Sequence, residues 1–404
     1  MLSPVPELPC RVLLLCAEDT APRTVMARSS CRSLVQDALE QRPEALLLWL
    51  EGPAQLTLYL DAIAALPAPL PVLACVPGAD LDAQRRGFER GVQVWLENPD
   101  GLDAALPWAR WQFERQQALQ GKLDERRWTE QAKSVLMHSC ALDEEAAHRL
   151  LRESAMQARL RLAELSRSVV QAAQLAEGVN LAGQQRMLSQ RIVKLIAQRA
   201  AAIEPRRAKQ LQDESAARIE ANLMRLHERL PGFDLQPVNS AWAALKPLLM
   251  GKPTAEVLLR ADAAAQELLE CSEQLTEAIE AAGAGRPLHL VNVCGRQRML
   301  SQRLAKQALL ADLLPREFGL DMGESLDAFA NGLAELEAAP LSSPDIRELQ
   351  AAARDEWLHL LRALRGSHGR EAASGLARSS EVLLGQFDRL TASYQQSLQV
   401  LLLA

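Results

Sequence analysis

A fifteen-residue motif occurs twice in this chain of 404 residues. NLAGQQRMLSQRIVK begins at Asn180 and NVCGRQRMLSQRLAK begins at Asn292, and ten of the fifteen paired positions are identical. Apolar residues recur at helical spacing after each copy, between breaks rich in Pro and Gly. A unit repeated in tandem predicts two homologous helical bundles, over residues 175–283 and 284–404.

Composition agrees with a mostly α protein. Hydrophobic residues make up 48% of the chain and aromatic residues only 4%, a balance typical of packed helices. Segment 1–105 differs, because the apolar runs CRVLLLC, ALLLWLE, PVLACV and VQVWLE alternate there with helical stretches. Buried strands separated by helices predict a small α/β domain with a parallel sheet covered on both faces.

The N-terminal segment resembles the response-regulator receiver domain in PEALLLWLEGP, PVLACVPGAD and GFERGVQVWLENP. Trp49 stands at the position of that family's phosphoacceptor aspartate, Val76 at its hydroxyl residue and Asn98 at its lysine. An indole cannot accept a phosphoryl group, and only Glu18 and Asp19 match the acidic pocket. The segment before ALLLWLE is predicted to be too short for the usual helix and strand. The resemblance implies a degenerate receiver that serves for dimerisation or, alternatively, holds a degenerate ligand pocket.

Residues 127–174 resemble the ANTAR module, the three-helix RNA-binding domain of antitermination regulators. The matching elements are QAKSVLM from Gln131, LLR from Leu150 and AMQARLRL from Ala155. The resemblance implies a structured leader RNA as partner. The candidate RNA-binding residues are Lys133, His148, Arg149, Arg152, Arg159 and Arg161.

Basic residues on two consecutive helices can follow the phosphates of a folded RNA loop, and His148 can stack on an unpaired base. The alternative is that these arginines form a solvated helical face. The formal net charge of -6 argues against a protein that coats nucleic acid indiscriminately, so any such site is local. Upstream, residues 106–126 predict a long coiled-coil helix, which by resemblance to receiver and ANTAR regulators is the stalk of a homodimer.

The repeated motif G-x-Q-R-M-L-S-Q-R-x-x-K resembles the signature box of PilJ-type and NIT-type sensory domains. The NIT-type resemblance implies nitrate or nitrite as ligand, and a planar guanidinium suits a small planar anion. In nitrate-sensing kinases the second arginine of the box clamps the ligand across a symmetric dimer. Carried over, this predicts that Arg191 and Arg303 meet around one anion. The candidate ligand-binding residues are Arg191, Arg303, Gly183, Gly295, Arg186, Arg298, Met187 and Met299.

The two boxes contain no Asp or Glu, which favours arginines that depend on a captured anion. The alternative is that the arginines pair with acids elsewhere in each bundle. For Met187 and Met299 the alternative is a place in the apolar core.

Other functions have little support in the sequence. The six histidines show no metal-ligand spacing, and no phosphate-binding glycine loop or catalytic triad pattern is found, so neither a catalytic residue, a metal nor a cofactor is expected. Seven scattered cysteines predict reduced thiols. No signal peptide or membrane-spanning stretch is found, so we expect a cytoplasmic protein without a membrane partner.

Together the resemblances imply a non-enzymatic regulator that responds to nitrate or nitrite, binds leader-RNA hairpins and promotes transcription antitermination. The alternative is an anion-sensing adaptor that binds a protein and not RNA. DNA binding is not supported, because no helix-turn-helix pattern is found.

Overall fold

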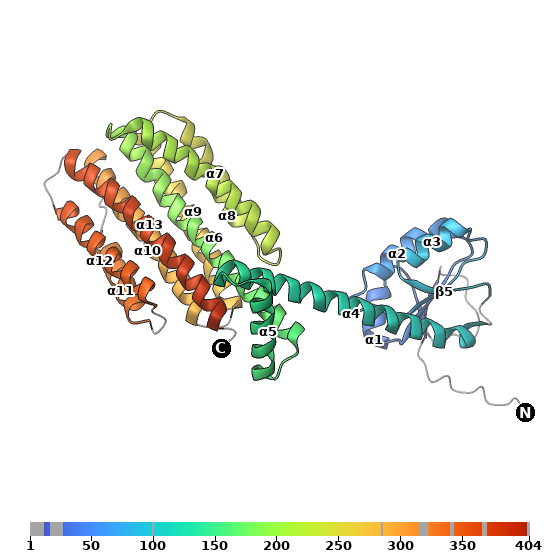
Figure 1. The fold of residues 1–404 in the computed structure, drawn as a ribbon. Helices are drawn as coiled ribbons and strands as arrows, with labels where there is room; N and C mark the ends of the chain where they lie inside the picture. The colour runs from blue at the N-terminus through green and yellow to red at the C-terminus, as the bar shows by residue number, and fades with distance from the viewer. Residues whose placement is uncertain are drawn as a thin grey trace, which may run out of the picture. The chain divides into compact units, whose positions relative to one another are not determined.

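The computed structural model describes residues 12–16, 27–98, 101–283, 286–314, 322–339, 343–365 and 370–401. The chain divides into two compact units, one ending at Arg126 and the other beginning at Arg127. Figure 1 shows the helices and strands with the labels used below.

The first unit contains a five-stranded parallel sheet in the order β2-β1-β3-β4-β5, which is the order of flavodoxin-like doubly wound folds. The predicted apolar runs form four of the strands. Alternate residues of β1 and β3 enter two separate cores, with Leu13 on one face of the sheet and Leu14 on the other. The strands are β1 Val12–Cys16, β2 Ala27–Ser29, β3 Ala45–Trp49, β4 Val72–Cys75 and β5 Val92–Leu96. The helices of this unit are α1 Leu34–Gln41, the short η1 Pro53–Gln55, α2 Leu56–Ala64, α3 Leu81–Glu89 and the start of α4 Leu102–Cys140.

One expectation for this unit is wrong. The segment predicted to be too short for a strand contains β2, which pairs in parallel with β1. Trp49 is the last residue of β3, Val76 follows β4, and Asn98 lies just beyond β5. Glu18 and Asp19 lie outside the described residues.

The second unit begins with three helices that share a small apolar core. They are the end of α4, α5 Glu144–Ala158 and the start of α6 Leu162–Ala200. Ala132, Leu151 and Val169 are fully buried members of this core, one from each helix. Asp143 caps α5, because its Oδ1 accepts the backbone N–H of Ala146 at 2.7 Å. Within α4, residues 114–127 are exposed.

Two helical bundles follow, and α6 runs without a break from the three-helix module into the first of them (Figure 1). The first bundle consists of α6, α7 Pro205–Arg229, α8 Gln236–Leu245, η3 Lys246–Met250 and α9 Ala255–Ala282. The second consists of α10 Arg286–Leu313, α11 Gly323–Glu337, α12 Pro344–Arg365 and α13 Arg370–Leu401.

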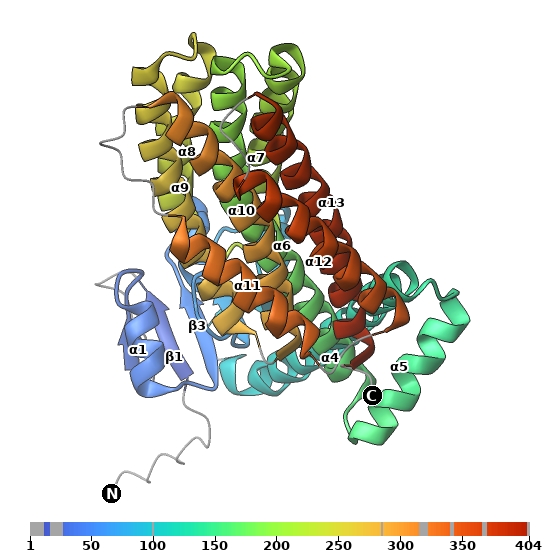
Figure 2. The same ribbon diagram turned by 90° about the vertical axis from the view of Figure 1, so that its left-hand side faces the viewer.

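The two motif helices, α6 and α10, pack against each other in the middle of the paired bundles (Figure 2). On their flanks α6 packs on α9 and α10 packs on α13, so the second bundle repeats the arrangement of the first. A single apolar cluster extends through both bundles. The mostly α fold predicted from the sequence is therefore confirmed. No helix in the described ranges is both long and apolar enough to cross a membrane.

The second bundle offers a test of this packing at Phe329. Its ring is fully buried and stacks on Trp357 with the ring centroids 4.1 Å apart. Because a cavity would remain, Phe329→Ala is expected to lower the free energy of unfolding by about 3–5 kcal/mol. The measurement is guanidinium denaturation followed by far-ultraviolet circular dichroism. Met224→Ala is the control, since Met224 is 65% exposed and its loss is expected to cost below about 0.5 kcal/mol. Equal stability of the two variants would contradict the packing.

Candidate functional site

The two motif helices touch at their glycines. A Cβ placed on Gly183 would lie 3.7 Å from the Cα atom of Gly295, and a Cβ on Gly295 would lie 3.7 Å from the Cα atom of Gly183. At these distances an added Cβ would make ordinary van der Waals contact with the facing backbone. The contact relates the two copies of the motif by an approximate twofold axis.

Two buried guanidinium groups lie beside this contact. Arg186 and Arg298 are 0% and 1% exposed, although arginine side chains are rarely fully buried. From the Cβ position of Gly295, Nη2 of Arg186 lies at 3.0 Å and Nη2 of Arg298 at 3.4 Å. From the Cβ position of Gly183 the same two atoms lie at 3.1 and 3.7 Å. Both arginines thus converge on the glycine crossing.

Each of these arginines binds the asparagine that begins the other copy of the motif. Nη2 of Arg186 donates to Oδ1 of Asn292 at 2.7 Å, and Nη2 of Arg298 donates to Oδ1 of Asn180 at 2.8 Å. The two copies are therefore joined by a reciprocal pair of hydrogen bonds. A repeated motif produces such a pair only when both copies enter one interface.

A carboxylate from a flanking helix forms an ion pair with each of the two arginines. Nη1 of Arg186 pairs with Glu273 on α9, and Nη1 of Arg298 pairs with Asp388 on α13 at 2.6 Å. Nε of each arginine is buried and has no hydrogen-bond partner among the described residues. Burial lowers the pKa of the Arg186 guanidinium; Glu273 opposes this shift, whereas Arg296 and Arg298 add to it. The site therefore contains two directed N–H donors that the flanking acids leave unused.

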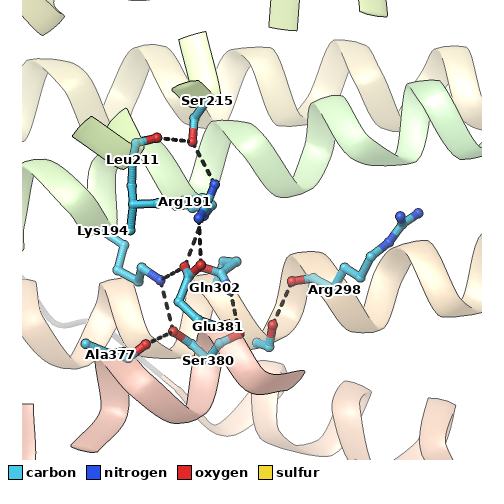
Figure 3. A network of polar contacts seen from close by, with 10 residues as sticks. Arg191, Lys194, Leu211, Ser215, Arg298, Gln302, Ala377, Ser380 and Glu381 are labelled. Carbon is cyan, nitrogen blue, oxygen red and sulfur yellow. Dashed lines mark hydrogen bonds and ion pairs between the residues drawn. The ribbon is translucent and has the colours of Figure 1, made fainter. Parts of the chain in front are cut away.

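The second arginine of the first motif has a different environment (Figure 3). Nη2 of Arg191 pairs with Glu381 of α13 at 2.6 Å, its Nε donates to the same carboxylate at 3.0 Å, and Nη1 donates to Ser215 at 3.0 Å. The fully buried Lys194 also binds Glu381 at 2.6 Å, and it donates to Ser380 at 3.0 Å. One carboxylate is thus shared by two cations.

Burial sets the protonation of this cluster. It lowers the pKa of Lys194 to about 8, against the pull of Glu381. Burial also works to raise the pKa of Glu381, but Lys194 and Arg191 together lower it to about 2. The carboxylate is therefore ionised at neutral pH, and Lys194 keeps its proton only with the help of Glu381.

The predicted shortage of carboxylate partners is wrong for Arg186, Arg191 and Arg298, each of which pairs with an acid from a distant helix. Arg303 differs, since no described residue forms a hydrogen bond or ion pair with it. Its neighbour Lys306 pairs with Asp262 at 2.6 Å. Arg191 points at Glu381, whereas Arg186 and Arg298 converge on the glycine crossing. The meeting of Arg191 and Arg303 stays a prediction.

Met187 and Met299 belong to the apolar core that extends through both bundles. Their exposed fractions are 2% and 6%, and the core position is the alternative weighed from the sequence. Neither side chain is needed to explain an anion site.

The candidate RNA-binding residues of α5 share its exposed face. His148, Arg149 and Arg152 are exposed, while Ala147 and Leu151 face the small core. Arg159 follows the helix as its left-handed cap, with φ 56°, and is also exposed. This face presents cations to solvent at helical spacing.

Two further candidates are engaged within the protein. Lys133 has 9% of its side chain exposed and pairs with Glu130 at 2.8 Å and Glu144 at 2.7 Å. The ion pair with Glu144 joins α4 to α5, and the contact of Lys133 with RNA phosphates stays a prediction. Arg161 is exposed, but it pairs with Glu164 at 2.6 Å at the start of α6.

The sequence did not indicate several residues that contact the motif arginines. The two motif asparagines, Asn180 and Asn292, are identical in both copies, and that identity was a usable signal. Glu273, Asp388 and Glu381 carried no such signal, because they lie 87 to 190 residues from their arginines, outside either motif. No group of acids, cysteines or histidines within the described ranges is arranged to hold a metal ion.

The geometry shows two helical bundles joined to a three-helix module, and sequence comparison assigns families to both parts. Residues 168–267 and 287–390, together more than half of the chain, match the PilJ family, described as the N-terminal region of type IV pili methyl-accepting chemotaxis transducers. The chain belongs to this family of sensory domains. Residues 117–170 match the ANTAR domain. No curated protein matches the chain. The protein is thus an ANTAR-type regulator with PilJ-type sensing domains, which are regulatory and not catalytic families.

The shared carboxylate offers a test of the Arg191 cluster. Glu381→Gln removes the counter-charge of buried Lys194 and is expected to lower the free energy of unfolding by about 3 kcal/mol near neutral pH. Lys194 binds protons more weakly in the folded state than in the unfolded chain, so raising the pH from about 7 to about 9 should reduce this deficit as the amine deprotonates. Urea denaturation of the unaltered chain and of Glu381→Gln at several pH values measures this difference in the free energy of unfolding.

Glu348→Gln is the control, since Glu348 is exposed on α12. It should leave stability nearly unchanged at each pH. A Glu381→Gln deficit that stays constant or grows as the pH rises would contradict the shared-carboxylate cluster.

Proposed function

We propose that this protein is a nitrate- or nitrite-responsive regulator that binds leader-RNA hairpins and promotes transcription antitermination. Its targets would be genes of nitrate and nitrite assimilation, and it would act in the cytoplasm, where transcripts are made. The ANTAR match supports RNA binding, and the PilJ match supports sensing. The observation that carries the sensing half is the convergence of Arg186 and Arg298 on the glycine crossing.

The anion site that we propose lies between these two arginines. Two guanidinium groups within the same buried region repel each other, and an anion between them relieves that repulsion. The unused Nε–H groups and the Nη2–H groups beside Gly183 and Gly295 are donors at fixed positions. A planar anion with three oxygens can accept from both guanidinium planes, which favours nitrate, with nitrite as the smaller analogue.

Anion binding would reach the RNA module through α6. This helix includes both Arg186 of the sensor and Val169 of the small core that holds α5 in place. An anion that draws α6 and α10 together would therefore shift the helix on which α5 packs. The coupling operates through the difference in anion affinity between two positions of α6.

The RNA-binding surface that we propose is the exposed face of α5 with His148, Arg149, Arg152 and Arg159. Cations spaced along one face suit phosphate contacts, and an exposed imidazole suits stacking on an unpaired base. A homodimer through the exposed part of α4 would present two such faces to two RNA hairpins.

One observation favours an adaptor as the second candidate. Met156 is 72% exposed and Leu160 is 46% exposed, close to the arginines of α5. Exposed apolar side chains suit a protein partner. The salt dependence of RNA affinity distinguishes the RNA-binding regulator from the adaptor, because RNA binding weakens steeply with salt through counterion release.

Titration calorimetry of the full chain with sodium nitrate tests the sensor, with nitrite, chlorate and sulfate as comparison anions. Arg298→Lys keeps one charge but loses the planar fork, so nitrate affinity is expected to fall about ten- to hundredfold. Arg303→Ala is the matched control, because no described residue bonds to Arg303, and it should bind nitrate as the unaltered chain does. If Arg303→Ala loses nitrate binding while Arg298→Lys keeps it, the site between Arg186 and Arg298 is contradicted. The anion would then bind at the second arginines of the motif, Arg191 and Arg303.

RNA binding is tested with a synthetic RNA of two hairpins joined by an unpaired linker. Arg149→Gln with Arg152→Gln should weaken binding about tenfold or more and reduce the salt slope by about 2, one for each lost phosphate contact. Fluorescence anisotropy at several salt concentrations measures both quantities. The control pair is Arg206→Gln with Arg347→Gln, two exposed arginines outside the module. Equal affinity of both double variants would favour the adaptor.

A further inference from the structure

A crevice lies where the RNA module meets the sensor. It has a volume of about 740 Å³ and is bounded by the end of α4, the middle of α6, the end of α7 and the end of α13. All of these segments belong to the second compact unit. The volume falls in the range of roughly 300–1,000 Å³ in which proteins bind small ligands.

The chemistry of the walls is unusual for a small-molecule pocket. Five amide side chains line the crevice, which are Gln131, Gln174, Asn180, Gln395 and Gln396. Amides both donate and accept hydrogen bonds, and so match the edges of nucleobases. His138 adds a ring on which a base can stack.

The charges at the crevice favour an anionic guest. Arg225 and Arg229 lie on the α7 side, and Glu177 on α6 pairs with Arg225. One arginine charge is therefore in excess of the single acid of the lining. Amide groups for a base and a guanidinium for a phosphate together match one nucleotide.

We propose that this crevice holds an unstacked nucleotide of the RNA that the ANTAR-type module binds. This proposal rests on the proposed function, and it adds a second RNA contact on the sensor itself. The matched ANTAR segment supplies the α4 wall and Val170, and the remaining walls come from the sensor helices. The RNA therefore bridges the two parts of the protein.

One residue of the crevice is also a member of the anion site. Asn180 lines the crevice and accepts the hydrogen bond from Nη2 of Arg298. Gln395, from the opposite wall, accepts a hydrogen bond from Asn180 at 3.5 Å and donates to the backbone oxygen of Ala176 at 3.0 Å. A nucleotide that binds these amides shares a hydrogen-bonding partner with Arg298. Anion and RNA then influence each other's affinity directly, and the coupling is reciprocal.

The test uses the full chain and the two-hairpin RNA with 4-thiouridine in its unpaired linker. Arg229→Gln removes one cation of the crevice and is expected to weaken binding about three- to tenfold, with a salt slope smaller by about 1. Arg206→Gln is the matched control, an exposed arginine near the other end of α7, about 35 Å away along the helix. Ultraviolet crosslinking followed by mass spectrometry is expected to mark residues of the crevice walls in addition to α5.

The outcomes separate this inference from the proposed function. If the α5 variants weaken binding while Arg229→Gln behaves as Arg206→Gln does, and crosslinks are confined to α5, the crevice proposal is overturned and the RNA-binding function stands. If the full chain does not bind the RNA at all, both fall. A final arm adds free adenosine, guanosine, cytidine and uridine monophosphates to the unaltered chain. Mononucleotides that bind in the crevice without competing with the RNA would identify a free nucleotide as its ligand and overturn the RNA contact.

Discussion

The contact between α6 and α10 at Gly183 and Gly295 is the constraint on which the rest of the sensory region depends. The two backbones face each other here, and the guanidinium groups of Arg186 and Arg298 fill the space beside the glycines. The approach brings the following arginines, Arg186 and Arg298, into one buried region and lets each reach the asparagine of the other motif. A bulkier residue at either glycine would press on the Arg186 guanidinium before it met the facing backbone.

Burying several cations is a poor way to stabilise a bundle, because desolvation offsets most of the gain from ion pairing. Apolar residues of similar size would pack at least as well. The bundles instead contain Arg186, Arg298 and Lys194, all at most 1% exposed, each held by one acid from a flanking helix. Such an arrangement is better suited to the anion response proposed above than to stability alone.

One continuous helix joins the ANTAR-type module to the PilJ-type bundles. α6 supplies the third helix of the module and the first helix of the sensor in one run of 39 residues. A helix transmits displacement along its axis because its backbone hydrogen bonds are consecutive. The crevice beside Asn180 adds a shorter connection, through side chains instead of the backbone.

The sequence alone determined the helical class, four of the five strands, the duplicated bundles, and the two families confirmed by comparison, since these depend on local periodicity and on identity between motif copies. Only the tertiary structure decided which arginines meet. Position along a helix shows which residues share a face, but not which face a distant helix covers. Glu381, 190 residues beyond Arg191 in the chain, pairs with that arginine, a contact that no local pattern indicated. The short strand β2 was missed because three residues carry too little pattern. Lys133 likewise became an interhelical contact because Glu144 folds onto it from the next helix.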